Sequence, residues 1–492
     1  MTFAKMIDQV VSSANSQNNI LTDGQLTCYY RNIPDFFKSI DKYFADNEIR
    51  VENNLAIECV NSVSSALTLL YLLKKGYSFF LSPLLRNGRK ECSVKPLMPK
   101  FCQYKITIEK RLNNETTEPD KYPENLLRVE RCEQRCFESK MESNGGGKLN
   151  LRTSGSTAAS KIVVHSHVKL LGNATNCVKR YQFESEDRIA IPVPISHLYG
   201  FGAAFLPGII AGASIDFQEN SNILRYMGRE RKFEPNIAFL TPALCEMLLK
   251  GHKASRTYKL VVTSGERIKK DIFFEFESRF GRLVNQYGST EMGAIAASYP
   301  DDPIEVRATT IGKPMPGVHM RLTKKSSESD EEVAGIGELC CKHEYGFEGY
   351  IDEYGNRISQ GVPTPSDWFE TGDLAKIQQN GSIEVIDRCD HSVVRRGFLV
   401  LFADIERAME RIEATERVVV VAKGESKQGK RIVAFCVLRH RNSLSSEQIR
   451  AACFDLLPRY AIPDDVFLID SMPTLPNGKV DRQALLKIAP SS

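Results

Sequence analysis

Hydrophobic positions in the first 390 residues occur as short runs that alternate with helical patterns. Two helices are predicted, over Ser62–Lys74 and Asp271–Phe280. The alternation of strands with helices is typical of βα units with parallel strands, so the pattern predicts an α/β fold. The predicted strands are Leu55–Cys59, Arg188–Val193, Ser214–Phe217, Ile237–Leu240 and Leu260–Thr263.

The pattern changes after about Asp390. A helix from about Ala403 is followed by predicted strands at Arg417–Ala422 and Arg431–Leu438, and a second helix runs from Ser445 into Leu456. About 100 residues suffice for a separate domain. We therefore expect a large domain over residues 1–389 and a small α+β domain over 390–492.

Composition narrows the classes of function. Lysine and arginine (65) barely exceed aspartate and glutamate (61), giving a net charge of +4. A dedicated nucleic-acid binder would carry a concentrated basic patch, so this class is disfavoured. The thirteen cysteines show neither a disulfide framework nor zinc-site spacing, which predicts reduced and mostly buried thiols.

The chain shows no targeting or membrane segment by pattern. Its start, MTFAKMIDQVVSS, lacks a basic region followed by a long apolar core. The most apolar stretch, Leu55–Leu73, is interrupted by Glu58 and Asn61, whereas a membrane span needs about 18 or more apolar residues in a row. We expect a cytoplasmic protein without a membrane span.

Residues 151–167, LRTSGSTAASKIVVHSH, contain a loop rich in hydroxyl groups and closed by Lys161. Successive backbone N–H groups in such a loop form a concave anion site, which suits phosphate oxygens. A solvent-exposed Ser/Thr/Gly loop is the alternative. His165 and His167 have no carboxylate or cysteine partner in the pattern, so a metal site there is disfavoured.

Residues 285–293, NQYGSTEMG, follow a predicted strand. The ring of Tyr287 can stack on a base, and Thr290 offers a hydroxyl. The Glu291 carboxylate suits Mg²⁺ shared with phosphates, because Mg²⁺ keeps several waters and needs few protein ligands. An ordinary turn with an exposed glutamate is the alternative.

Two further segments carry candidate polar groups. In WFETGDL, Asp373 can accept hydrogen bonds from both hydroxyls of a ribose, or can bond its own backbone in a turn. In PTLPNGKVDR, Lys479 follows the tight-turn pair Asn477-Gly478 and presents an ammonium group suited to phosphate, although lysines at turns are often merely solvated.

The order of these segments resembles the ANL superfamily of adenylate-forming enzymes: acyl- and aryl-CoA synthetases, peptide-synthetase adenylation domains and luciferases. TSGSTAASK is similar to the phosphate loop, PISHLYGFG to the acyl-pocket motif, TSGE to the adenine-flanking loop and YGSTE to the aromatic–Thr–Glu motif. IGKPMPG, GEL, TGD, the hinge-like DRCDHSVVRRG and PNGKVDR follow in the same order.

The resemblance implies a large domain of mixed β-sheets flanked by helices, a small mobile domain and a role for each matched residue. Lys479, Thr290 and Glu291 would be catalytic, with Glu291 binding Mg²⁺. Asp390 would be the hinge. Tyr287 would stack on the adenine and Asp373, helped by Arg388, would hold the ribose. The remaining nucleotide-binding residues would be Thr153, Ser154, Gly155, Ser156, Thr157, Lys161, Gly265, Glu266 and Gly288.

The implied reaction joins a carboxylic acid to ATP as an acyl-adenylate and then to the thiol of coenzyme A or of a carrier-protein phosphopantetheine. The pocket candidates His197, Tyr199 and Phe201 include no carboxylate for an α-ammonium group, which favours an acid without an α-amino group. The resemblance of TSGE and GSTEM to aryl-CoA ligases of the benzoate type implies an aromatic or short acid. An amide- or lactone-forming enzyme and a catalytically silent nucleotide-binding scaffold are the alternatives.

The sequence departs from the family pattern in its phosphate loop. Ala158-Ala159-Ser160 stands where the family usually has glycine, a variable residue and proline before the lysine. Because glycine permits positive φ without steric cost, its loss restricts the loop. The charged inserts before residue 150 have no counterpart in the motifs.

Overall fold

The computed structural model describes most of the chain, in two compact units. The first unit comprises Met1–Met320, Cys341–Phe369 and Asn380–Ser382, and the second comprises Arg321–Cys340, Glu370–Gln379 and Ile383–Ser492. The single domain boundary after residue 389 stays a prediction. The described residues are 1–84, 98–108, 126–132, 146–152, 161–219, 222–251, 256–323, 335–358, 367–395, 398–426, 429–440, 444–474 and 480–489.

A nine-stranded sheet forms one half of the first unit. Its central strands are parallel, and the pairs at both edges are antiparallel. The parallel pairing predicted from the βα pattern is therefore confirmed. The order is β15 (Lys313–Pro314), β14 (Gly293–Ala297), β13 (Gly281–Ser289), β12 (Tyr258–Thr263), β11 (Ile237–Leu240), β9 (Arg188–Ile191), β10 (Ser214–Phe217), β1 (Ile20–Thr22) and β2 (Thr27–Tyr29).

An eight-stranded sheet forms the other half, and it is mixed as well. Four neighbouring strands are parallel, and the strands that flank them are antiparallel. The order is β19 (Arg357–Ile358), β18 (Gly349–Ile351), β8 (Ile162–Ser166), β7 (Lys148–Arg152), β4 (Ser78–Pro83), β3 (Asn54–Cys59), β5 (Tyr104–Ile108) and β6 (Leu127–Arg131).

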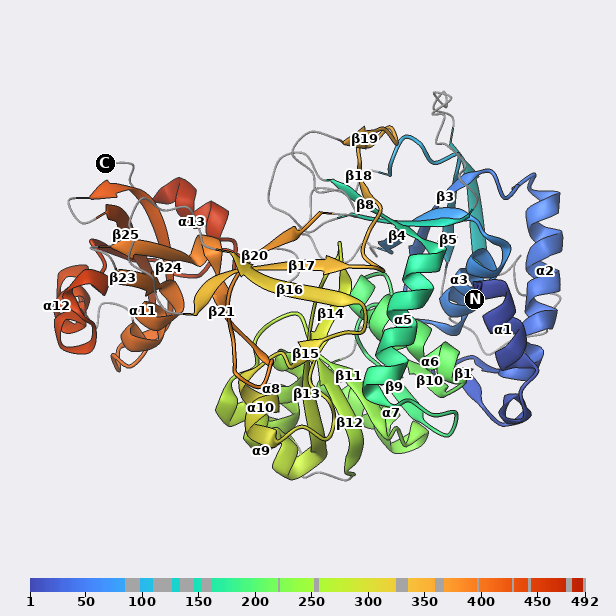
Figure 1. Ribbon diagram of the computed structural model, residues 1–492, viewed down its shortest axis with the longest axis horizontal. Coiled ribbons are helices and arrows are strands. Elements are labelled where there is room, and N and C mark those ends of the chain that lie inside the picture. The colour runs from blue at the N-terminus through green and yellow to red at the C-terminus, as the bar shows by residue number, and fades with distance from the viewer. Residues whose placement is uncertain are drawn as a thin grey trace. The chain divides into compact units, whose positions relative to one another are not determined.

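Helices and one continuous core join the two sheets. α5 contacts β8 of the smaller sheet and β14 of the larger one (Figure 1). α3 is buried on all sides from Val63 to Leu73, and Ser62 caps its start by accepting a hydrogen bond from Ser65 N at 3.1 Å. The helices of this unit are α1 (Phe3–Val11), α2 (Ile33–Asp46), α3 (Val63–Lys75), α5 (His167–Tyr181), α6 (Leu206–Ala211), α7 (Ile223–Phe233), α8 (Pro242–Gly251), α9 (Lys270–Phe280) and α10 (Ile304–Thr309).

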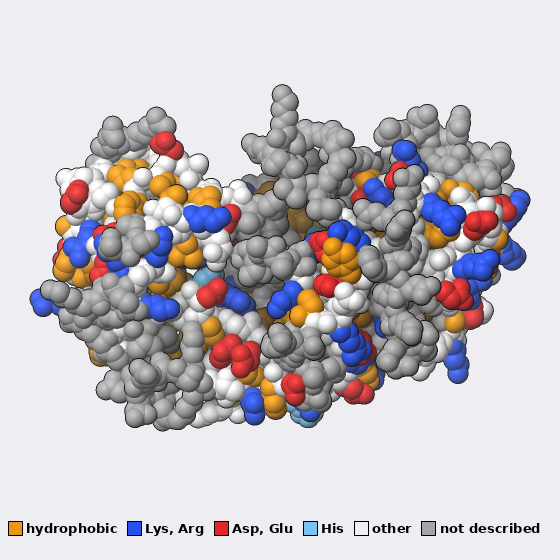
Figure 2. Space-filling model, turned by 90° about the horizontal axis from the view of Figure 1, so that it is seen from above, with side chains coloured by type: hydrophobic (Ala, Val, Ile, Leu, Met, Phe, Trp, Pro, Cys, Tyr) orange, Lys and Arg blue, Asp and Glu red, His pale blue; other side chains and the backbone are white. Residues whose placement is uncertain are grey.

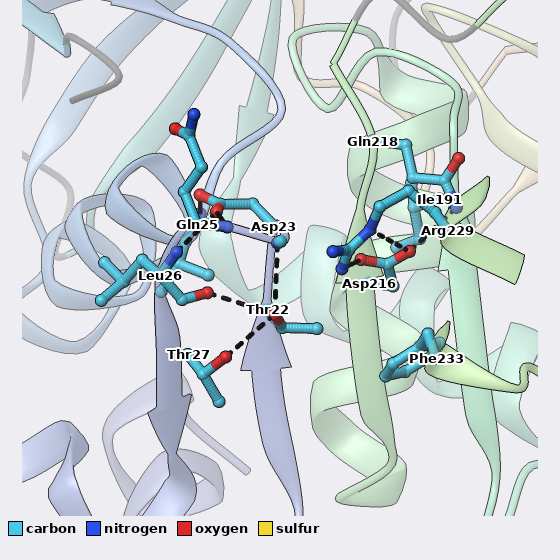
Figure 3. Close-up of polar contacts among 12 residues, drawn as sticks. Thr22, Asp23, Gln25, Leu26, Thr27, Ile191, Asp216, Gln218, Arg229 and Phe233 are labelled. Carbon is cyan, nitrogen blue, oxygen red and sulfur yellow. Dashed lines mark hydrogen bonds and ion pairs between the residues drawn. The ribbon is translucent and has the colours of Figure 1, made fainter. Parts of the chain in front are cut away.

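A buried carboxylate fixes the carboxyl end of β10. Asp216, whose side chain is 0% exposed, forms an ion pair with Arg229 and accepts a hydrogen bond from Gln218 Nε2 at 2.9 Å (Figure 3). Nearby, Asp23 accepts from the backbone N–H groups of Gln25 and Leu26, each at 2.9 Å (Figure 3). Burial raises the pKa of Asp216. Arg229 and Gln218 therefore compensate a charge that burial alone would penalise.

The second unit is a small α+β body, as predicted. Ile405 and Met409 of its first helix pack with Ile449 and Cys453 of the next against Val420 of the sheet. Its main sheet has the order β23 (Phe398–Leu401), β22 (Ser392–Arg395), β25 (Gly429–Leu438), β24 (Thr415–Ser426), and β26 (Asp465–Leu468) pairs with β25. The helices are α11 (Phe402–Met409), α12 (Ser446–Leu456) and α13 (Arg482–Ile488).

A further four-stranded sheet has the order β16 (Val318–Thr323), β17 (Ile336–His343), β20 (Phe369–Ile377) and β21 (Ile383–Arg388). Ten of the eleven described cysteines are buried and none of the eleven forms a disulfide, as expected. Among the described residues, no helix combines the length and apolarity that crossing a bilayer requires. On the face seen in Figure 2, basic and acidic side chains are interspersed, in keeping with the net charge of +4.

Candidate functional site

The turn between β13 and β14 carries the aromatic–Thr–Glu segment. Tyr287, Thr290 and Glu291 are half-buried, and Gly288 is exposed. A Cβ atom on Gly288 would lie 2.3 Å from the carbonyl oxygen of Gly293, so the hairpin can close only with glycine at this position. The narrow hairpin thus places Thr290 and Glu291 at its tip.

Buried side chains fasten the main chain of this turn. His165 Nε2 lies 2.7 Å from Thr290 O, and His343 Nδ1 lies 2.9 Å from Met292 O. Asn173 Nδ2 also donates to Met292 O, at 3.2 Å. Because a carbonyl oxygen only accepts, His165 carries its proton on Nε2 and His343 on Nδ1. The backbone on both sides of Glu291 is therefore held in place.

Both histidines stay neutral over the physiological range. Burial lowers the pKa of His165 and of His343 to about 4. His167, the first residue of α5, is likewise buried, and burial lowers its pKa to about 4. Within the described residues there is no cluster of three His, Cys, Asp or Glu side chains suited to a metal. The contact that the structure shows for His165 is its hydrogen bond to the carbonyl oxygen of Thr290 in the turn.

The Glu291 side chain meets Tyr350 of the eight-stranded sheet, and the ring of Tyr350 in turn contacts Lys161. Tyr350 donates its hydroxyl hydrogen to Glu291 Oε1 at 2.9 Å, and Lys161 Nζ lies 5.2 Å from the centre of the Tyr350 ring. The register explains the meeting, because β18 pairs with β8 so that Tyr350 opposes Val163, two residues after Lys161. Burial first, and then the Glu291 charge, raise the pKa of Tyr350, so the phenol remains a donor.

The phosphate-loop prediction falls largely outside the described residues, as does Lys479. Arg152 and Ile162, which flank the segment 153–160, are paired across β7 and β8. Lys161 is described and contacts Tyr350. The undescribed loop residues are Thr153, Ser154, Gly155, Ser156 and Thr157.

The adenine-flanking residues lie in an exposed turn after β12. Gly265 has a φ of +96°, and Glu266 follows it at the surface. β12 and β13 are parallel, with Thr263 opposite Asn285. The turn and Tyr287, which lies two residues beyond Asn285 on β13, therefore lie toward the same carboxyl edge of the parallel strands, where ligands of open α/β sheets usually bind.

The three acyl-pocket candidates lie around a π-helical turn, Tyr199–Phe205. Tyr199 directs its hydroxyl at Val262 O (2.9 Å) and Leu240 O (3.1 Å), at the carboxyl ends of two parallel strands. His197 is exposed, whereas Phe201 is fully buried in the core. Their role as pocket residues stays a prediction.

The second unit holds the ribose candidate. Asp373 on β20 pairs across the sheet with Arg388 on β21, and Arg388 Nη1 lies 3.0 Å from Asp373 Oδ1. Gly372 has a φ of +70°, and a Cβ there would lie 2.8 Å from Arg388 Nη2. Glycine is therefore required beneath the arginine. Asp390 is exposed on the short turn Cys389–His391, and its role as a hinge stays a prediction.

Within the first unit, the structure brings Lys161, Thr290 and Glu291 to one place. Sequence reasoning missed Tyr350, and it missed the anchoring roles of His165, Asn173 and His343. Tyr350 belongs to a three-residue strand whose pairing with β8 is not written in its own neighbourhood. No local signal would have identified it.

The geometry around Glu291 fits a magnesium ion shared with phosphates. Tyr350 occupies one carboxylate oxygen, and within the described part of the chain no donor reaches the other. Mg²⁺ is commonly held by one or two carboxylates together with substrate phosphates and water. Lys161 adds positive charge over the ring of Tyr350, whose hydroxyl contacts this carboxylate, and such a charge suits the same phosphates.

Comparisons with known proteins match two family models to this chain. Residues 151–351 match the family described as AMP-binding enzyme, and residues 404–479 match the AMP-binding enzyme C-terminal domain. Bacitracin synthase 1 of Bacillus licheniformis is 27% identical over 342 residues, which are 68% of this chain and 6% of that protein. Salicylyl-CoA synthase / salicylate adenylyltransferase of Streptomyces sp is 24% identical over 350 residues, 68% of this chain and 62% of the relative.

The chain spans less than two thirds of the length of the curated relatives it matches. Among solved structures, ATP-bound MatB from Rhodopseudomonas palustris superimposes with a TM-score of 0.75 at 17% identity, covering 99% of both chains. The o-succinylbenzoate CoA synthetase of Bacillus subtilis, in complex with its acyl-adenylate, gives 0.74 at 18% identity, covering 99% of this chain and 98% of that one. These likenesses confirm the predicted fold class.

Proposed function

The chain belongs to the superfamily of AMP-binding, adenylate-forming enzymes, and from this premise we propose that it activates a carboxylic acid with ATP and passes the acyl group to a thiol. The observation that carries the proposal is the meeting of Lys161, Tyr350 and Glu291 at the tip of the β13–β14 hairpin. It joins a predicted phosphate-binding lysine to a predicted magnesium carboxylate across about 130 residues of chain.

In the first step, a carboxylate oxygen of the acid attacks the α-phosphorus of ATP. The new P–O bond forms as the bond to the bridging oxygen breaks, and pyrophosphate leaves. Negative charge spreads over the phosphoryl oxygens, so positioning and cationic groups supply most of the catalysis. Lys161 would bind the phosphates, Thr290 would contact the α-phosphate and Lys479 would stabilise the transition state. Bound Mg²⁺ would supply further positive charge, held by Glu291.

The adenine would be held by residues at the carboxyl edge of the large sheet. Tyr287 offers its ring to the adenine, bordered by Gly265, Glu266 and Gly288. Asp373, oriented by Arg388, would accept from the ribose hydroxyls. The half-buried ring at a strand end favours stacking, because a flat apolar face next to exposed backbone suits a base.

In the second step, the thiol sulfur attacks the acyl carbon, a C–S bond forms and AMP leaves. The relatives include both a salicylyl-CoA synthase and a bacitracin synthase, so coenzyme A and a carrier-protein phosphopantetheine are both proposed acceptors. A movement of the C-terminal domain about Asp390 would separate Lys479 from the adenylate before the thiol enters. We propose an aromatic or short acid, a choice that the similarity to the salicylate-activating relative favours. The cytoplasmic location stays a prediction.

ATP–pyrophosphate exchange across a panel of aryl and short acyl acids tests the first step. We expect exchange with at least one acid, followed by thioester formation when coenzyme A or a phosphopantetheinylated carrier protein is added. Exchange without any thioester, but with an amide or lactone product, would favour the second enzyme class. Exchange with none of the acids would favour the silent scaffold.

A further inference from the structure

Tyr350 is the described residue that fixes the carboxylate of Glu291. The main chain around Glu291 is held by contacts from His165, Asn173, His343 and Phe347, and the Phe347 N–H donates to Glu291 O at 2.8 Å. They leave the side chain free to rotate, because each of its single bonds has three staggered positions. Within the described residues, the Tyr350 hydroxyl is the donor that selects one of them.

We propose that Tyr350 is a positioning residue for the metal-binding carboxylate: it holds Glu291 Oε1 so that Oε2 is presented to Mg²⁺ and its phosphates. This inference rests on the proposed function. A hydrogen bond from a neutral phenol to an ionised carboxylate is charge-assisted and therefore strong for its kind. Partners that orient a metal-binding group typically change metal affinity by about 10- to 100-fold.

The ring and the hydroxyl of Tyr350 have separate contacts. The ring packs edge-on against Phe347, with centroids 5.0 Å apart, and its face carries the Lys161 ammonium group. The hydroxyl alone reaches Glu291. Tyr350→Phe therefore removes the positioning bond and leaves the packing and the lysine contact in place.

Tyr354 provides a matched control. Its hydroxyl accepts a hydrogen bond from Lys100 Nζ at 3.0 Å, and the same ammonium lies 4.6 Å from its ring centre. It thus repeats a lysine–tyrosine contact four residues away, at a side chain that is 44% exposed. Tyr354→Phe removes a hydroxyl of the same kind without touching Glu291.

The test measures Mn²⁺, as a paramagnetic substitute for Mg²⁺, by electron paramagnetic resonance with a non-hydrolysable ATP analogue present. We expect Tyr350→Phe to weaken Mn²⁺ binding about tenfold and Tyr354→Phe to leave it unchanged. The Mg²⁺ concentration for half-maximal exchange should rise in parallel, with the KM for the acid unchanged. Thermal unfolding of each variant reports whether folding is preserved.

A double-mutant cycle with Glu291→Gln isolates the pair. Once the charged acceptor is gone, Tyr350→Phe should cause little further loss of Mn²⁺ binding. An equal loss in both backgrounds would overturn the positioning role, as would unchanged Mn²⁺ binding in Tyr350→Phe alone. Weakened Mn²⁺ binding together with no exchange for any acid would reject the proposed reaction and leave the role of Tyr350 standing.

Discussion

Asp216 and Glu291 are two carboxylates at the ends of strands in the same unit, and they differ in how completely the protein surrounds them. Asp216 is fully buried, and both of its oxygens are occupied by Arg229 and Gln218. Glu291 is half-buried, and its side chain accepts one hydrogen bond from the described residues, from Tyr350. When both oxygens of a carboxylate have partners within the protein, the carboxylate serves the folded structure. When only one oxygen has such a partner, the other can bind a group from solution.

Removing the cation from the satisfied carboxylate should give the largest effect. Arg229→Met leaves the Asp216 charge buried without its ion-pair partner, and breaking such a pair typically costs about 3–5 kcal/mol of unfolding free energy. Denaturant unfolding measures the loss. Exchange activity per folded molecule should be retained, and its loss would show that the two carboxylates are not independent.

The stability of Arg229→Met should depend on pH, and the pKa of Asp216 sets the direction of that dependence. Burial already raises the pKa of Asp216, and removing Arg229 should raise it further. A folded-state pKa above the unfolded value means that stability is retained below the unfolded pKa and lost as pH rises through the folded pKa. The deficit of Arg229→Met should therefore shrink as pH falls through the raised folded-state pKa of Asp216, and it should be smallest below about pH 4. A deficit that is constant with pH would contradict the assignment.

Neutralising Glu291 should have the opposite effect, with a large loss of exchange activity and little change in stability. Glu291→Gln keeps the shape of the side chain and removes its charge, so ATP–pyrophosphate exchange should fall by about a hundredfold. The unfolding free energy should hardly change, because Tyr350 retains an acceptor. A large loss of stability with normal exchange per folded molecule would make Glu291 a structural residue like Asp216.

Removing the contact of His165 with the β13–β14 turn should have an intermediate effect on both the unfolding free energy and the exchange activity. His165→Ala leaves the carbonyl of Thr290 without its buried donor, which typically costs about 1–3 kcal/mol. Exchange should fall less than in Glu291→Gln, because the carboxylate remains. Chemical denaturation and exchange assays on the same preparation compare the two losses.

The smallest effect is expected at an exposed ion pair. Arg282 Nη1 lies 2.7 Å from Asp301 Oδ1, with side chains that are 45% and 71% exposed. Arg282→Ala should change the unfolding free energy by less than about 1 kcal/mol and leave exchange unchanged. A larger loss would show that the solvent exposure of a charged side chain does not predict how much it contributes to stability.

The strands and helices could be predicted from local pattern because their signals are local. Ser214–Phe217 and Ile237–Leu240 appear with the predicted bounds, and the helix predicted over Asp271–Phe280 begins one residue earlier, at Lys270. Asn173 and His343 gave no such signal. Each reaches Met292 from more than 50 residues away, and their polar atoms become partners of the turn only after the two sheets have packed.

Site residues could be proposed from the sequence where a residue and its neighbours share one chemistry, as in YGSTE. Tyr350 lies in FEGYID, where nothing next to it suggests a phosphate or a metal. Its significance depends on which strand it pairs with, and that choice is made by long-range packing. The same reasoning explains why Gly372 was recognised as part of TGD while its closeness to Arg388 was not.

With Glu291 as the proposed magnesium carboxylate, the pairing of Tyr350 with Val163 makes the alignment of two strands a determinant of metal binding. Side chains along a strand point alternately to opposite faces, so sliding β18 by one residue would turn the phenol away from Glu291 and Lys161 alike. Single-residue insertions or deletions between Phe347 and Ile351 would therefore be far more damaging than substitutions at the same positions. The length and register of this short strand therefore decide whether the Tyr350 hydroxyl reaches Glu291.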